Sequence, residues 1–127
     1  SAWSAAIDAG GLAFDFNGWA RSFAQSPVDT STFVITLLDA GAVPVLAYDS
    51  GALDNTLAWQ EVQTRLLAPA GTRSVRIDLL STRHAGSNND GYFDNLSLVA
   101  VPVPEPASAL LMALGGLAWL ARRRLQG

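Results

Sequence analysis

The chain has 127 residues and a net charge of −3, contains no cysteine, and uses only arginine as its strongly basic residue. Without cysteine it has neither disulfide bonds nor thiol chemistry. Residues 1–104 carry ten acidic side chains and five arginines. This acidic balance argues against nucleic acid as a partner, because a nucleic-acid-binding domain presents a basic face. About 100 residues precede the C-terminal segment, enough for one hydrophobic core.

The chain begins at Ser1 without the basic and apolar segments of a signal peptide. We therefore expect the first domain, residues 1–101, to be N-terminally truncated if the protein is exported.

Three segments of this domain alternate side chains with a period of two, which is typical of half-buried strands. Their apolar positions are Leu12, Phe14 and Phe16; Phe33, Ile35 and Leu37; and Val75, Ile77 and Leu79. Turn-forming pairs such as Gly10-Gly11, Asn17-Gly18 and Ser26-Pro27 separate the segments. The pattern predicts an all-β domain, a jelly-roll-type antiparallel β-sandwich.

The stretch from Asp54 to Ala68 allows two interpretations. Trp59, Val62 and Leu66 lie at helical spacing after a possible N-cap at Asp54. The same residues fit a strand from Glu61 to Ala68. We expect a short turn or helix over 54–58, followed by that strand.

Residues 66–72, 75–77 and 90–98 resemble the last strands of galactose-binding-like β-sandwiches, the fold that many carbohydrate-binding modules share. The "YFDN-L-L" pattern of residues 92–98 carries most of this resemblance. It marks a fold more than a ligand.

Asp94 is the candidate for a structural metal site. It alternates with Tyr92, Leu96 and Leu98, so if the leucines point inward, Asp94 does as well. A buried carboxylate must meet backbone amides, an arginine or a cation. The galactose-binding-like resemblance implies a structural Ca²⁺ there, for which carboxylates and carbonyls are suitable ligands. An aspartate that accepts loop amides without a metal is the alternative.

Aromatic side chains suggest a glycan site. Trp19, Tyr48 and Trp59 are the candidates for stacking on sugar rings, and Trp19 is the best of them because it follows Asn17-Gly18. Core packing is the alternative for each, since Trp and Tyr bury large areas. Arg21, Arg76 and Asp78 either supply polar contacts or form a solvated sheet face.

No enzyme motif stands out. His84 is the only histidine and lies in a polar segment, and no Gly-x-Ser-x-Gly nucleophile elbow occurs. The sequence predicts a protein that is not an enzyme.

The C-terminal segment has three parts. Residues 102–106 form a proline-rich linker, residues 107–121 are free of charge, and residues 122–127 form a basic tail that begins with Arg122, Arg123 and Arg124. The apolar part spans roughly 23 Å as a helix at ~1.5 Å per residue. This is shorter than a bilayer core of about 30 Å, but snorkelling arginines extend it. We expect one transmembrane helix with the arginines on the cytoplasmic side and the sandwich outside. A buried core helix is the alternative.

Pro104, Glu105 and Pro106, the apolar run and the arginine cluster together resemble the PEP-CTERM sorting signal of Gram-negative bacteria. The resemblance implies export and processing near the motif by an exosortase, a membrane-embedded transpeptidase. It also implies a link to exopolysaccharide or biofilm. We expect a cell-surface or extracellular-matrix protein with a non-catalytic sandwich that works by protein contact. The alternative is a lectin-like module that binds exopolysaccharide.

Overall fold

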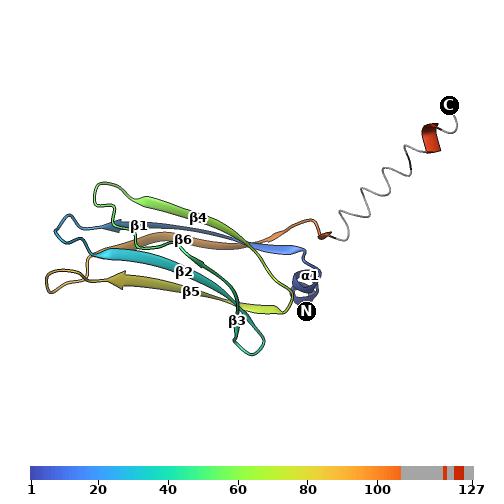
Figure 1. Ribbon diagram of the computed structural model, residues 1–127, viewed down its shortest axis with the longest axis horizontal. Helices are drawn as coiled ribbons and strands as arrows, with labels where there is room; N and C mark the ends of the chain where they lie inside the picture. Colours follow the sequence, from blue (N-terminus) through green and yellow to red (C-terminus); the bar gives the residue numbers. More distant parts are fainter. Residues whose placement is uncertain (107–118, 120–121, 125–127) are drawn as a thin grey trace.

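The computed structural model describes residues 1–106, 119 and 122–124. This part of the chain forms one short helix and six strands: α1 (Ala2–Asp8), β1 (Leu12–Ser22), β2 (Thr30–Asp39), β3 (Pro44–Asp49), β4 (Gln60–Leu67), β5 (Thr72–Thr82) and β6 (Gly91–Pro102). The strands form two antiparallel sheets, ordered β4-β1-β6 and β3-β2-β5, that stack on one another (Figure 1). The predicted all-β sandwich is confirmed at this level.

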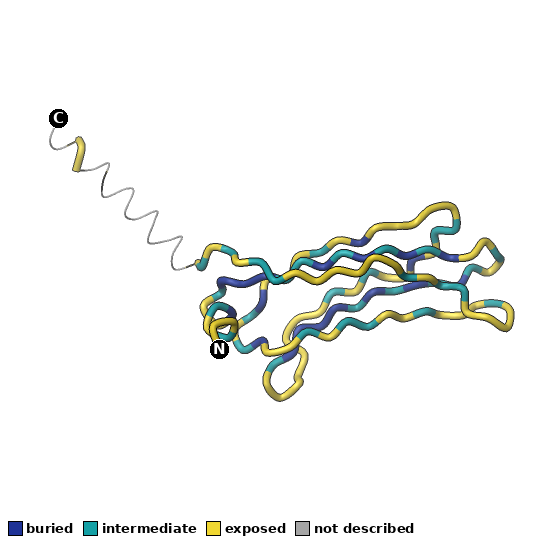
Figure 2. The backbone as a smooth tube through the Cα atoms, turned by 180° about the vertical axis from the view of Figure 1, so that it is seen from behind, coloured by how far each residue is buried: buried dark blue, intermediate teal, exposed yellow. Residues whose placement is uncertain are grey.

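The core lies between the sheets and follows the predicted alternation. Phe33, Ile35 and Leu37 on β2 are fully buried and face Leu12 and Phe16 on β1. Buried and partly buried positions alternate along much of the central strands β1 and β2 (Figure 2). Side chains on one face of a strand are two residues apart, so the period-two reading located these strands correctly.

Gly18 lies inside β1 and not in a turn, which corrects the prediction made from Asn17-Gly18. A Cβ atom at Gly18 would lie 2.9 Å from the ring of Phe33. That ring also packs against Phe16 and Phe93, with centroid distances of 5.3 and 5.1 Å. The glycine therefore makes room for the central aromatic cluster.

The stretch before β4 is a bend in which the side chain of Asn55 accepts hydrogen bonds from the amides of Leu57 and Ala58, both at 3.0 Å. Strand β4 then begins at Gln60. The expected turn followed by a strand is confirmed, with Asn55 in the capping role that we assigned to Asp54.

Helix α1 was not predicted. Ser1 caps it, and Ile7 anchors it in the core. Asp8 joins it to the β4–β5 turn through Arg73 at 2.7 Å and the amide of Gly71 at 2.8 Å. The guanidinium of Arg73, assisted by that amide, lowers the pKa of Asp8 to about 2.

The predicted transmembrane helix, residues 107–121, lies outside the described residues except for Trp119. Among the residues that the structure describes, no helix has the length and apolar character needed to cross a membrane. Arg123 places its guanidinium carbon 4.6 Å from the ring centroid of Trp119, a cation–π contact.

Candidate functional site

The outward-pointing residues of β4, β1 and β6, here called the outer face, form a polar surface that also carries aromatic side chains. Paired residues on neighbouring strands point to the same side of a sheet. The register therefore sets Trp19 between Glu61 and Asp94, and Asn17 between Gln63 and Ser97. Rows of three side chains, one from each strand, therefore follow one another along the outer face.

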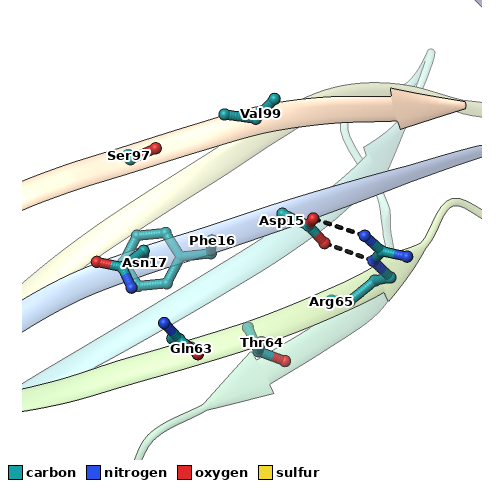
Figure 3. A pocket seen from close by; sticks show the side chains of 8 residues that line it. All are labelled: Asp15, Phe16, Asn17, Gln63, Thr64, Arg65, Ser97 and Val99. Atoms are coloured by element: carbon teal, nitrogen blue, oxygen red, sulfur yellow. Dashed lines mark hydrogen bonds and ion pairs between the residues drawn. The ribbon is translucent and has the colours of Figure 1, made fainter.

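The middle of the outer face is a shallow depression of about 540 Å³ (Figure 3). Asp15 on β1 and Arg65 on β4 face one another, with Nε and Nη2 of the arginine donating to the two carboxylate oxygens at 2.6 and 2.7 Å. This pairing lowers the pKa of Asp15. Asn17 Nδ2 donates to Glu61 at 3.1 Å, and Gln63 donates to the same carboxylate oxygen. Amide and carboxylate groups are thus presented side by side.

The end of the outer face farthest from α1 carries aromatic side chains. Trp59 and Tyr92 are each about 40% exposed and line a depression of about 350 Å³ together with Arg21 and Phe23. Arg21 is held by a hydrogen bond of 3.3 Å from Nη2 to the carbonyl of Thr56. A guanidinium plane beside two aromatic rings suits a ligand that has both apolar and polar faces.

The three glycan candidates do not form one site. Trp19 is half-buried on the outer face, and Trp59 lies at its aromatic end. Tyr48 belongs to β3 in the other sheet and packs against the core. The structure also brings Tyr92 beside Trp59 and Arg21, a juxtaposition of distant segments that the order of residues in the chain does not reveal.

The prediction that Asp94 points inward was wrong. Asp94 is exposed, pairs with Trp19 on the outer face and accepts a hydrogen bond from the amide of Asn95 at 2.8 Å. A β-bulge causes the difference: the register shifts between Asn17 and Trp19, and Asn95 adopts φ +49°. The extra residue reverses the faces, so Phe93 takes the inward place. Within the described residues, no group of three or more His, Cys, Asp or Glu side chains gathers as a metal site.

The buried carboxylate of this domain is Asp29, which sequence reasoning did not identify. It is fully buried and accepts hydrogen bonds from the amides of His84 at 2.6 Å, Ala85 at 3.2 Å and Asp90 at 3.0 Å. These bonds, the one from His84 foremost, lower its pKa. His84 itself is exposed, and its ring contacts Thr30 Oγ1 at 3.4 Å.

The segment that follows β6 lies against the sandwich at the end where α1 lies. Strand β6 includes Pro102, one residue beyond the predicted boundary, because Pro102 pairs with Leu12 and needs no amide donor there. The amide of Val103 then donates to the carbonyl of Gly11 at 3.0 Å. Pro104 and Pro106 are exposed, and Glu105 is partly covered.

Two glycines make this close approach possible. A Cβ atom at Gly11 would lie 2.9 Å from Cγ of Glu105, and one at Gly10 would lie 3.2 Å from Cδ of Pro106. The Pro104-Glu105-Pro106 segment is therefore an exposed strip that rests on the Gly10-Gly11 corner. Pro106 itself has helical backbone geometry.

Residues 102–124 match the PEP-CTERM protein-sorting motif. The motif covers the Pro104-Glu105-Pro106 strip and Arg122 to Arg124, whose side chains are exposed. Neither a curated protein nor a solved structure matches the chain.

The PEP-CTERM motif implies an exported protein that is sorted through its C-terminus and handled by an exosortase. The matched residues include almost none of the sandwich, because they overlap the described strands only at Pro102. Sorting and any binding activity of the sandwich are thus carried by separate parts of the chain.

Proposed function

We propose that this chain is an exported cell-surface or extracellular-matrix protein whose C-terminal segment is processed by an exosortase and whose sandwich is non-catalytic. The match of residues 102–124 to the PEP-CTERM motif carries the proposal. The exposure of Pro104 and Pro106 supports it, since a processing enzyme needs an accessible and extended substrate.

In this proposal, residues 107–121 span the inner membrane as a helix. Arg122 to Arg124 stay on the cytoplasmic side, where the positive-inside rule favours them. The sandwich lies outside, and the sorting motif sits at the outer membrane surface within reach of a membrane-embedded transpeptidase.

The test is processing of the full-length precursor in a host with a matching exosortase. Replacing Pro104, Glu105 and Pro106 together by alanine should leave the uncleaved protein to accumulate, as immunoblots of cell fractions would show. Pro102→Ala is the matched control, because it removes a proline of β6 and leaves Pro104, Glu105 and Pro106 in place. If the triple variant is processed as fast as the control, the C-terminal segment is not a sorting signal.

A lectin-like activity of the outer face is the second candidate function. One observation favours it: the depression lined by Trp59, Tyr92 and Arg21 lies on the same face as the amide and carboxylate side chains around Trp19. Sugars offer apolar C–H faces that stack on aromatic rings and hydroxyls that bond to amides and carboxylates. This reading includes the galactose-binding-like, jelly-roll type of sandwich, which the resemblance of β4 to β6 supports, and the cell's own exopolysaccharide as ligand.

Pull-down with native exopolysaccharide tests this second function. Trp59→Ala and Trp19→Ala should each reduce retention by about tenfold, because loss of one ring that stacks on a sugar costs ~1.5 kcal/mol of binding free energy. Trp3→Ala is the control, since Trp3 is an exposed tryptophan on α1 at the other end of the sandwich. Equal retention of all three variants would contradict glycan binding by the outer face.

A further inference from the structure

The two edge strands β5 and β6 leave one flank of the sandwich open. Among the described strands, β5 ends its sheet next to β2 and β6 ends the other sheet next to β1. Leu79 pairs with fully buried Phe33, and Leu98 pairs with buried Phe16, so both leucines point between the sheets. They are nevertheless 42% and 37% exposed, and Leu96, two residues from Leu98, is 41% exposed. Interior positions thus reach solvent along this flank.

The open flank continues toward α1 as an apolar groove. A depression of about 350 Å³ is lined there by Phe14, Val75, Ala100 and Trp3, among others. Val75 precedes Ile77 and Leu79 on the inner side of β5, and Ala100 follows Leu98 on β6. One apolar seam therefore runs along both edge strands, beside main-chain groups of β5 that have no neighbouring strand on that side among the described residues.

The outer side of β5 carries opposite charges two residues apart. Arg76 and Asp78 bond to one another at 3.0 Å, and their side chains are 56% and 37% exposed. Ile77 lies between them and points inward, opposite buried Ile35. The edge strand therefore carries a cation and an anion at equal distances on the two sides of Ile77.

We propose that this flank binds a second copy of the chain, with β5 of one copy pairing antiparallel to β5 of the other about a two-fold axis at Ile77. In that register Arg76 of each copy stands opposite Asp78 of the other, which forms two cross-strand ion pairs on the outer side. On the inner side Val75 stands opposite Leu79 and Ile77 opposite its own copy. The sheet β3-β2-β5 then continues through the paired β5 strands into its counterpart.

The charges also disfavour the two nearest registers that keep inner side chains opposite inner side chains. Shifting the two strands by two residues in one direction sets Arg76 opposite Arg76, and in the other direction sets Asp78 opposite Asp78. A shift of one residue would set inner side chains of one copy opposite outer side chains of the other, so the apolar seams of the two copies would lie on opposite faces of the joined sheet. The Ile77 register is the one in which both the charges and the apolar seam match.

Strand β6 benefits from the same arrangement. It contacts β5 and lies on the same flank, so the axis at Ile77 brings β6 of the two copies toward one another. Leu96 and Leu98 of both copies then cover the seam from the other sheet. Association through equal patches is the usual geometry of homodimers.

Cross-linking of the full chain tests the position of the axis. The chain has no native cysteine, so Ile77→Cys introduces a single thiol that meets its copy only if β5 pairs as proposed. Mild oxidation should join most Ile77→Cys chains into disulfide-linked dimers, because the two inward-pointing thiols would face one another directly within the seam. Gln63→Cys, on exposed β4 of the other sheet, should stay unlinked. Equal linking of both variants, or none in the Ile77 variant, would overturn the proposal.

Charge reversal tests the register and separates association from folding. Arg76→Asp alone sets two carboxylates opposite one another, and Asp78→Arg alone sets two guanidinium groups opposite one another. Each should weaken dimerisation of the detergent-solubilised full chain at least tenfold, by sedimentation or by energy transfer between labelled copies.

A mixture of the two single variants should dimerise again, because each new charge then meets its opposite in the other chain. Since the C-terminal segment is the same in every variant, association through it cannot produce this rescue. Single variants that dimerise like the parent, a mixture that stays monomeric, or a monomeric parent would each contradict the pairing of β5. A monomeric parent would mean that the edge of β5 is available to a strand of a different protein.

Discussion

Among single residues, Asp29 is a fully buried carboxylate. Its two oxygens accept three backbone amides from the loop between β5 and β6. A buried carboxylate stays ionised only when such donors replace water. Asp94, which follows that loop on the next strand, is exposed and accepts one amide from its own neighbour.

Asp29→Ala should therefore lower the melting temperature by more than about 5 °C, because three partly buried backbone amides lose their acceptor. Asp94→Ala should change it by less than about 2 °C, as is usual for exposed positions. Thermal unfolding followed by circular dichroism measures both. Similar losses in the two variants would show that the loop does not depend on Asp29.

Gly18→Ala should destabilise the domain by about 1–3 kcal/mol, because the new methyl group would push into the rings of Phe33 and Phe16 in a packed core. Gly41→Ala is the matched control: its Cβ atom would make only an ordinary contact of 3.5 Å with Asp39. Urea unfolding of the two variants gives the free energies. A Gly18→Ala variant as stable as the control would mean that the aromatic cluster can shift.

At the scale of elements, helix α1 is held to the β4–β5 turn by the carboxylate of Asp8. Its pKa in the folded chain, about 2, lies below the ordinary value of 3.8. A lowered pKa means that the ionised form stabilises the folded state, so this contribution is complete above pH 3.8 and is lost as the pH falls toward 2.

Docking of α1 should thus loosen in that acidic window, and NMR of the Trp3 indole would follow it. Asp8→Asn should already be weakened at neutral pH and should show no transition between pH 3.8 and 2. The effect should be modest and should shrink with added salt, because Asp8 and Arg73 are partly exposed. An identical acid transition in the Asp8→Asn variant would assign it to another carboxylate.

The sorting strip is a second element whose position depends on the domain. Only Val103 separates β6 from Pro104, and the strip rests on Gly10-Gly11. An inserted Gly-Ser-Gly-Ser between Pro102 and Val103 should free the strip and speed exosortase processing several-fold, because flexible linkers extend the reach of a substrate. The same insertion after Gly41, in the exposed β2–β3 turn, is the control. Unchanged or slower processing would indicate that the enzyme uses the docked strip.

At the scale of the whole molecule, the sorting strip and the aromatic end of the outer face lie at opposite ends of β1. The strip rests beside Gly11 before the strand begins, and Arg21 near its end lines the aromatic depression. Figure 1 shows that the chain leaves the sandwich after β6 at the end where α1 lies. If the chain is held at its C-terminal segment, the aromatic end points away from the attachment. This separation suits a surface protein whose contacts face outward.

Removal of residues 107–127 should move the precursor from the membrane fraction to the soluble fraction, because this segment contains the longest charge-free run of the chain. Fractionation of cells that express either form measures the change. Partition of both forms into the soluble fraction would contradict the membrane anchor, while leaving the match to the PEP-CTERM motif as it stands.

The sequence alone determined the features that depend on neighbouring residues. Period-two alternation located β1, β2 and the inner side of β5, because the two faces of a strand alternate whatever it pairs with. The PEP-CTERM motif was visible because three short segments in a fixed order carry it. The turn before β4 was also predicted, because a turn is formed by neighbouring residues. Its amides are accepted by Asn55 and not by Asp54.

Only the tertiary structure decided which side chains meet. One bulge at Asn95 placed Asp94 on the outer face, and alternation read from the chain cannot detect an inserted residue. Asp29 lies more than 50 residues from the amides that it binds, and Trp59, Arg21 and Tyr92 come from three separate segments. Register between distant strands is set by packing of the core, so long-range contacts of this kind appear only when the two sheets are assembled.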